Sequence, residues 1–192
     1  MDSNGYLGFK PEHFAERRVQ GYHDHRLDGI SDLLYRARGS TVFDIGCNRG
    51  LAGFAFAYNG AKRVMGCDNY GTGIAVAREL FADLRSTPHR FEVCDLTGGP
   101  PAMRKAFGKD AELQHDIVLM LATYHKLKRI MPASQLSELM AWFGSKTVKH
   151  FGWRGYEEEI PQIDKDLGRA GLTRIHTSLI SDIQPAAIWA RS

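Results

Sequence analysis

The segment from Thr41 to Gly50 constrains the fold of this chain more than any other stretch. Residues 41–45, Thr-Val-Phe-Asp-Ile, are mostly apolar or β-branched and predict a short buried strand. Gly46 and Gly50 then bracket a tight turn, and an apolar stretch of helical length follows over 51–58. A strand, a glycine turn and a helix in this order predict an open α/β sheet, in which ligands bind beyond the carboxyl ends of the strands.

Length and composition favour one ordinary globular domain. The chain has 192 residues and a formal net charge of +3, so we expect a single domain over 1–192. No run approaches 18 apolar residues and the first residues lack a basic-then-apolar leader, which predicts no membrane association and a cytoplasmic location. The three cysteines, Cys47, Cys67 and Cys94, show no C-x-x-C spacing. They are expected to be reduced and buried, and no metal site is predicted.

Further apolar segments extend the α/β pattern along the chain. Strands are predicted over 62–68, 90–94, 115–122, 146–151, 172–177 and 186–190, and helices over 27–37, 73–84, 102–107, 133–143 and 160–170. The last two strands are joined too briefly for a crossover helix and should pair antiparallel. We therefore predict a three-layer Rossmann-like fold with a seven-stranded, mostly parallel sheet, a C-terminal antiparallel hairpin and a helical cap segment over 1–38.

Acidic residues stand at the ends of the first two predicted strands. Asp44 either accepts hydrogen bonds from the glycine turn or positions a bound cofactor. Asp68 follows the turn at about the distance, roughly 20 residues, where dinucleotide-binding proteins place a ribose-binding acid. A carboxylate accepts hydrogen bonds from both ribose hydroxyls. The alternative is that Asp68 or Asn69 caps the next helix, and the ribose role is favoured.

The segment Val42-Phe43-Asp44-Ile45-Gly46-Cys47-Asn48-Arg49-Gly50 resembles the first motif of the class I S-adenosylmethionine-dependent methyltransferases. In that family an acid precedes glycines at alternate positions, and Asn48 stands where this chain departs from the pattern. The rival dinucleotide motif, G-x-G-x-x-G, requires glycine where the chain has Asn48 and Leu51. A nicotinamide-dependent oxidoreductase is therefore the least favoured class.

The resemblance implies S-adenosylmethionine as cofactor and a set of residues that bind it. In the family, an acid and an apolar residue after the third strand hold the adenine, and Asp95 and Leu96 match them. A leading segment often folds over the cofactor, which makes Tyr22 and Arg26 candidates for contact with the methionine moiety, and the favoured alternative is a solvated capping helix. The implied cofactor-binding residues are Asp44, Gly46, Cys47, Asn48, Gly50, Asp68, Asn69, Asp95, Leu96 and Leu121.

The residues after the fourth strand are expected beside the transferable methyl group. The chain has neither the Asn/Asp-Pro-Pro-aromatic motif of amino-methylating nucleic-acid enzymes nor a Pro-Cys nucleophile there, and Asp116 lies at the wrong end of the strand for a catechol-type metal site. His125 is the candidate general base, since imidazole titrates near neutrality, and Tyr124 is the candidate for orienting a substrate. The alternative for His125 is a structural role.

The acceptor is expected to bind residues 1–26, 123–132 and 151–160, where Gly152-Trp153-Arg154-Gly155-Tyr156 resembles a binding loop. The resemblance implies methyl transfer to an oxygen or nitrogen atom of a small molecule, or of an exposed group on a sugar or polymer. Nucleic acid stays open as a partner, as does the oligomeric state. The alternative function is a module of the same fold that binds the cofactor or a partner without turnover.

Overall fold

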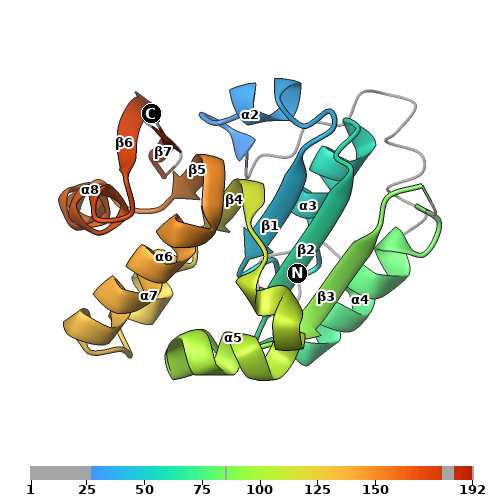
Figure 1. Cartoon of the computed structure of the whole chain (residues 1–192), viewed down its shortest axis with the longest axis horizontal. Coiled ribbons are helices and arrows are strands. Elements are labelled where there is room, and N and C mark those ends of the chain that lie inside the picture. The colour runs from blue at the N-terminus through green and yellow to red at the C-terminus, as the bar shows by residue number, and fades with distance from the viewer. Residues whose placement is uncertain (1–26, 85, 179–183, 192) are drawn as a thin grey trace.

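The computed structural model describes residues 27–84, 86–178 and 184–191. Its centre is a seven-stranded sheet in the order β3-β2-β1-β4-β5-β7-β6 (Figure 1). The strands are β1 Thr41–Ile45, β2 Arg63–Asp68, β3 His89–Val93, β4 His115–Leu121, β5 Thr147–Arg154, β6 Leu172–Ser178 and β7 Ala186–Arg191. β1 to β5 run parallel, and β7 pairs antiparallel with both β5 and β6. The predicted fold class is confirmed, including the C-terminal hairpin.

Helices cover both faces of the sheet and complete three layers (Figure 1). The α-helices are α2 Asp32–Tyr35, α3 Leu51–Tyr58, α4 Gly71–Phe81, α5 Gly99–Phe107, α6 Tyr124–Lys128, α7 Ala133–Lys146 and α8 Ile160–Gly168. Short 3₁₀ helices are η2 Leu96–Gly98, η3 Gly108–Glu112 and η4 Glu157–Glu159. None of the helices in the described residues is long and apolar enough to cross a membrane.

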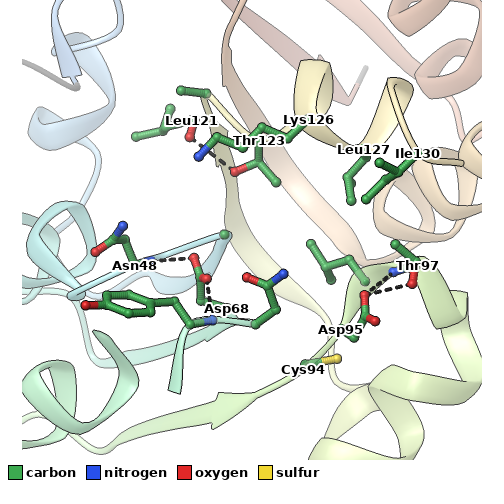
Figure 2. A pocket seen from close by; sticks show the side chains of 15 residues that line it. Asn48, Asp68, Cys94, Asp95, Thr97, Leu121, Thr123, Lys126, Leu127 and Ile130 are labelled. Carbon is green, nitrogen blue, oxygen red and sulfur yellow. Dashed lines mark hydrogen bonds between the residues drawn. The ribbon is translucent and has the colours of Figure 1, made fainter. Parts of the chain in front are cut away.

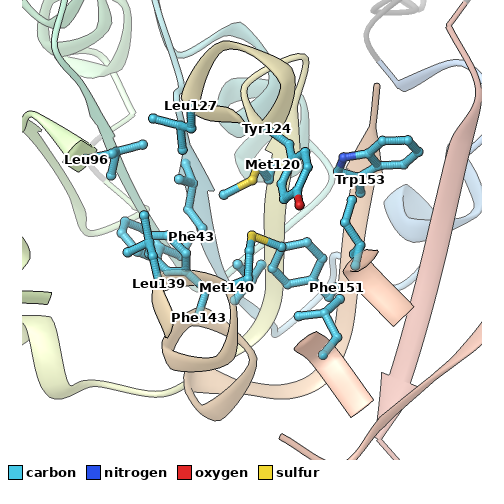
Figure 3. Packing of buried hydrophobic residues seen from close by; sticks show 14 of the residues in the cluster. Phe43, Leu96, Met120, Tyr124, Leu127, Leu139, Met140, Phe143, Phe151 and Trp153 are labelled. Carbon is cyan, nitrogen blue, oxygen red and sulfur yellow. The ribbon is translucent and has the colours of Figure 1, made fainter. Parts of the chain in front are cut away.

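Two apolar cores form because successive side chains of a strand point to opposite faces. Val42 of β1 packs with apolar residues of α2, α3 and α4 on one face. Phe43, the next residue, packs on the other face with α5, α7 and α8, where Met140 and Phe143 of α7 surround it (Figure 3). The mostly apolar β1 and β4 are buried on both faces, as central parallel strands are.

Several predicted boundaries are wrong. β5 extends to Arg154, so residues 152–154 belong to a strand rather than to a binding loop, and Trp153 is fully buried. The helix predicted over 102–107 begins earlier, because the segment 98–101 holds the end of η2 and the start of α5. Within the predicted helix over 27–37, only Asp32–Tyr35 is α-helical. The greater part of the predicted cap segment, together with Tyr22 and Arg26, lies outside the described residues.

His115 makes the stability of this fold depend on pH. It is buried at the start of β4, and its ring stacks on Phe43 with 5.1 Å between centroids. Burial, helped by the charge of Arg63, lowers its pKa to about 4. Below the unfolded-state pKa of about 6.5, the unfolded chain binds a proton that the folded protein excludes, so stability is lost as the pH falls from 6.5 toward 4.

We therefore expect the free energy of unfolding to drop by about 2 kcal/mol between pH 6.5 and pH 5 through this residue. Urea denaturation at a series of pH values measures the drop. His115→Leu should make the profile shallower over this range, with the slopes from the lowered pKa values of His125 and His150 remaining. His89→Gln, at an exposed position on β3, serves as the control and should retain the wild-type slope. An identical slope in His115→Leu and the wild type would contradict the assignment.

Candidate active site

A cavity of about 620 Å³ lies where the carboxyl ends of β1 to β4 meet (Figure 2). This volume falls within the range of roughly 300–1,000 Å³ that is usual for small-ligand sites. Each of the four strands contributes its following residues to the wall, and α6 closes one side. The lining residues are Gly46, Asn48, Asp68, Asn69, Tyr70, Cys94, Asp95, Leu96, Thr97, Leu121, Ala122, Thr123, Lys126, Leu127 and Ile130.

The turn between β1 and α3 depends on three left-handed residues. Gly46, Asn48 and Gly50 have φ angles of 72°, 50° and 73°. Asparagine adopts this conformation more readily than other residues with a side chain, so Asn48 preserves a turn that glycine forms in the family motif. The backbone amides of Gly46 and Cys47 both donate to the carbonyl of Cys67, at 2.8 and 2.9 Å, and tie the turn to the end of β2.

Asp68 connects this turn to the next one. Its Oδ2 accepts a hydrogen bond from the amide of Asn48 at 2.8 Å, and its Oδ1 accepts one from the amide of Tyr70 at 2.9 Å. The N-cap of α4 is Tyr70, so Asp68 is not the cap residue of that helix. Each carboxylate oxygen retains a second acceptor site, which leaves Asp68 able to bind hydroxyl groups in the cavity.

Asp95 holds the corresponding position after β3. As N-cap of η2, its Oδ1 accepts hydrogen bonds from the amide and the hydroxyl of Thr97, at 3.0 and 2.8 Å. Its Oδ2 accepts no hydrogen bond from another described residue, and the side chain is exposed to the cavity. Leu96 adds a largely buried apolar surface beside it. An acceptor oxygen next to an apolar wall suits a flat, partly polar ring with an amino group.

Solved structures with this architecture were found at low sequence identity. The magnesium protoporphyrin IX methyltransferase ChlM of Synechocystis PCC 6803, with bound SAM, gives a TM-score of 0.64 at 19% identity over 98% of this chain and 86% of its own. CalS10, an amino pentose methyltransferase of Micromonospora echinaspora with bound SAM, gives 0.64 at 13% identity over 97% and 99%. A TehB-like SAM-dependent methyltransferase of Corynebacterium glutamicum gives 0.61 at 15% identity over 95% and 98%.

The chain has the class I methyltransferase fold. This likeness covers nearly the whole chain and includes proteins of similar length, so the shared architecture is not confined to a nucleotide-binding half. No protein-family model matches the sequence, and no curated protein matches it. At this level of identity the neighbours establish the fold, and the chemistry has to be argued from the residues of the cavity.

Three of the predicted cofactor-binding residues lie behind the cavity wall of this methyltransferase fold. Asp44 is buried, and its Oδ2 accepts a hydrogen bond from the amide of Gly53 in α3 at 3.2 Å. Cys47 is buried, and burial together with the charges of Asp44 and Asp68 raises the pKa of its thiol. Gly50 is the N-cap of α3. These residues support the turn from behind. The other seven line the cavity: Gly46, Asn48, Asp68, Asn69, Asp95, Leu96 and Leu121.

The predicted catalytic pair does not line the cavity. Tyr124 is buried in the apolar core shared with α7 and α8, and burial raises its pKa to about 12 (Figure 3). His125 packs edge-to-face against Tyr156, with 5.0 Å between ring centroids. Burial, followed by the charges of Lys126 and Arg129, lowers the pKa of His125, so its ring is neutral at pH 7.

The sequence analysis assigns residues 123–132 to acceptor binding but does not identify which of their side chains line the cavity. Residues 124–128 form a helix, in which neighbouring side chains point to different sides. Thr123, Lys126, Leu127 and Ile130 recur at intervals of three and four residues, and all four line the cavity. This periodicity was the available signal. Within the described ranges, no cluster of three His, Cys, Asp or Glu side chains is arranged to hold a metal ion.

Proposed function

We propose that this protein is a methyltransferase that moves a methyl group from S-adenosylmethionine to an oxygen or nitrogen atom of an acceptor. The observation that carries the proposal is the convergence of Asp68, Asp95 and the glycine turn of β1 on one cavity (Figure 2). The neighbours ChlM and CalS10 support it, because both are methyltransferases whose structures contain SAM.

We assign each part of the cofactor to a group in the cavity wall. We assign the ribose hydroxyls to the free acceptor sites of Asp68, with Asn69 beside it. The adenine amino group is assigned to Oδ2 of Asp95, and the ring to the apolar surface of Leu96. Gly46, Asn48 and Leu121 are assigned to the methionine end. Asp44, Cys47 and Gly50 are assigned to supporting the turn from behind the wall.

The cofactor supplies a methyl carbon already activated by a positively charged sulfur. The protein therefore has to align the acceptor with that carbon and accommodate any proton that the acceptor loses. For a hydroxyl or amine acceptor, His125 remains the candidate to receive the proton, and its lowered pKa keeps it in the basic form at pH 7. Its position against Tyr156 means that such an acceptor would have to reach beyond the lining residues of α6.

Isothermal calorimetry with S-adenosylmethionine and S-adenosylhomocysteine tests the proposal. We expect saturable binding of both at one site per chain, and formation of S-adenosylhomocysteine when an acceptor panel is added. Absence of heat with either ligand would remove the basis of the proposal. Binding without product from any acceptor would favour the second candidate, a module without turnover, which the position of Tyr124 and His125 outside the cavity wall also favours. Full turnover in His125→Ala would eliminate His125 as the base.

A further inference from the structure

Lys126 brings a positive charge to the cavity from the α6 side. It lines the wall together with Thr123, and its side chain is exposed. Neither a hydrogen bond nor an ion pair joins its ammonium group to another residue in the described part of the chain. The two carboxylates of the cavity, Asp68 and Asp95, lie across from it (Figure 2). The cavity is thus divided into an acidic side formed by β2 and β3 and a cationic side formed by α6.

The neighbouring basic residues, Lys128 at the end of α6 and Arg129 after it, lie in a different environment from Lys126. Lys128 and Arg129 are exposed and do not line the cavity. Their charges act on Glu159, a buried carboxylate whose Oε2 accepts a hydrogen bond from the amide of Tyr156 at 3.1 Å. Lys128 and Arg129 therefore have a nearby carboxylate in Glu159, whereas Lys126 faces the cavity.

The cavity wall is also poorly equipped to remove a proton from an acceptor. Among its described residues, Asp68 and Asp95 are the carboxylates, and each already accepts hydrogen bonds from turn residues on the side assigned to the cofactor. His125 is outside the wall. An acceptor oxygen that is already negatively charged has no proton to lose. This chemistry matches a wall whose described residues include a cation but neither a histidine nor a carboxylate beyond the two assigned to the cofactor.

We infer that the acceptor is an anion, with a carboxylate or phosphate group that Lys126 holds through one oxygen while a second oxygen takes the methyl group. This inference rests on the proposed function. The attacking oxygen forms a bond to the methyl carbon with its own electron pair, and the carbon–sulfur bond breaks with its pair left on sulfur. The products are a methyl ester and neutral sulfur, and no proton is released. The transfer removes the positive charge of the sulfonium and the negative charge of the attacking oxygen together. Loss of both charges in a partly buried cavity favours the transfer.

Titration of the protein saturated with S-adenosylhomocysteine, followed by ¹H–¹⁵N NMR, tests this inference with three small probes. Benzoate and phenyl phosphate supply the two anions on one apolar ring, and benzamide supplies a neutral group of similar shape. We expect at least one anion to bind about 10-fold more tightly than benzamide, and Lys126→Met to remove that preference. The control is Lys105→Met, at an exposed position on α5 outside the cavity wall, which should retain it.

The outcomes separate this inference from the proposed function. Equal binding of benzamide and both anions, absence of anion binding, or an unchanged preference in Lys126→Met would each overturn it. Loss of S-adenosylhomocysteine binding in Lys126→Met would assign Lys126 to the cofactor and overturn it as well. If the wild type fails to bind S-adenosylhomocysteine, the proposed function fails, and the same titration on the free protein still reports whether Lys126 binds anions. A preference for one of the two anions identifies the acceptor group.

Discussion

Replacing Asp68 with alanine should lower the affinity for S-adenosylhomocysteine about 100-fold. The carboxylate is assigned two hydroxyl hydrogen bonds, and hydrogen bonds to a charged group contribute about 1.5–3 kcal/mol each. The change also removes the acceptors of the Asn48 and Tyr70 amides, at 2.8 and 2.9 Å, which hold the two turns in place. Because every 1.4 kcal/mol is about a tenfold change in affinity, a loss near 2.7 kcal/mol is a conservative expectation.

Calorimetry measures this loss, and a matched variant separates it from a general effect of removing an acid. Asp83→Ala removes an exposed carboxylate outside the cavity wall and should leave the affinity unchanged. Asp68→Asn keeps one acceptor oxygen but turns an NH₂ group toward a backbone amide, so we expect an intermediate loss of about tenfold. The thermal midpoint of the unliganded variants shows whether they remain folded. Wild-type affinity in a folded Asp68→Ala variant would contradict the ribose assignment.

The position of Asp68 illustrates what the sequence could predict. The bounds of β1 are those expected from its apolar run, because a buried parallel strand needs continuous apolar character. In parallel strands that are neighbours in the sheet, the carboxyl ends lie at the same edge, so the residues after β1, β2 and β3 meet without any further information. Gly46, Asp68 and Asp95 were identified by this rule together with the family resemblance, and all three line the cavity.

The role of Asp44 could have been predicted from the alternation of side chains along β1, which the sequence analysis does not apply. Val42 packs toward α3, and side chains two residues apart in a strand point to the same face. Asp44 therefore also points toward α3, where it accepts the hydrogen bond from Gly53 at 3.2 Å. The alternation along β1 favours the supporting role over direct contact with a ligand.

The extent of β5 could not be predicted locally. Gly152 interrupts the strand pattern and reads as a loop residue. A Cβ atom at this position would lie 2.7 Å from Leu33 Cδ1 and 3.0 Å from Leu119 Cδ2, so glycine is required by the close packing of α2 and β4 against β5. Leu33 is distant in sequence, and only the folded chain brings it to Gly152. Because Gly152 reads as a loop residue, the sequence also predicts a loop position for Trp153, which is buried in β5.

Replacing Gly46 with alanine should lower the free energy of unfolding by about 4 kcal/mol. The φ angle of 72° costs an L-residue about 1–2 kcal/mol. In addition, the new Cβ would lie 2.8 Å from Cγ2 and 2.9 Å from Cβ of Thr123, and overpacking typically costs about 1–3 kcal/mol. Thr123 is buried, and its hydroxyl donates to the carbonyls of Leu121 at 3.2 Å and Ile45 at 3.4 Å, so its side chain has little freedom to move away.

Gly39 supplies a control that separates the two contributions. Its φ angle is also 72°, but a Cβ atom there meets no atom within 4 Å, so Gly39→Ala should cost only the backbone strain of about 1–2 kcal/mol. Urea denaturation of both variants at one pH measures the difference. A cost for Gly46→Ala no greater than that for Gly39→Ala would show that Thr123 yields to the methyl group. The cavity would then tolerate a side chain at the end of β1, and Gly46 would no longer be evidence for close approach between this turn and the residues after β4.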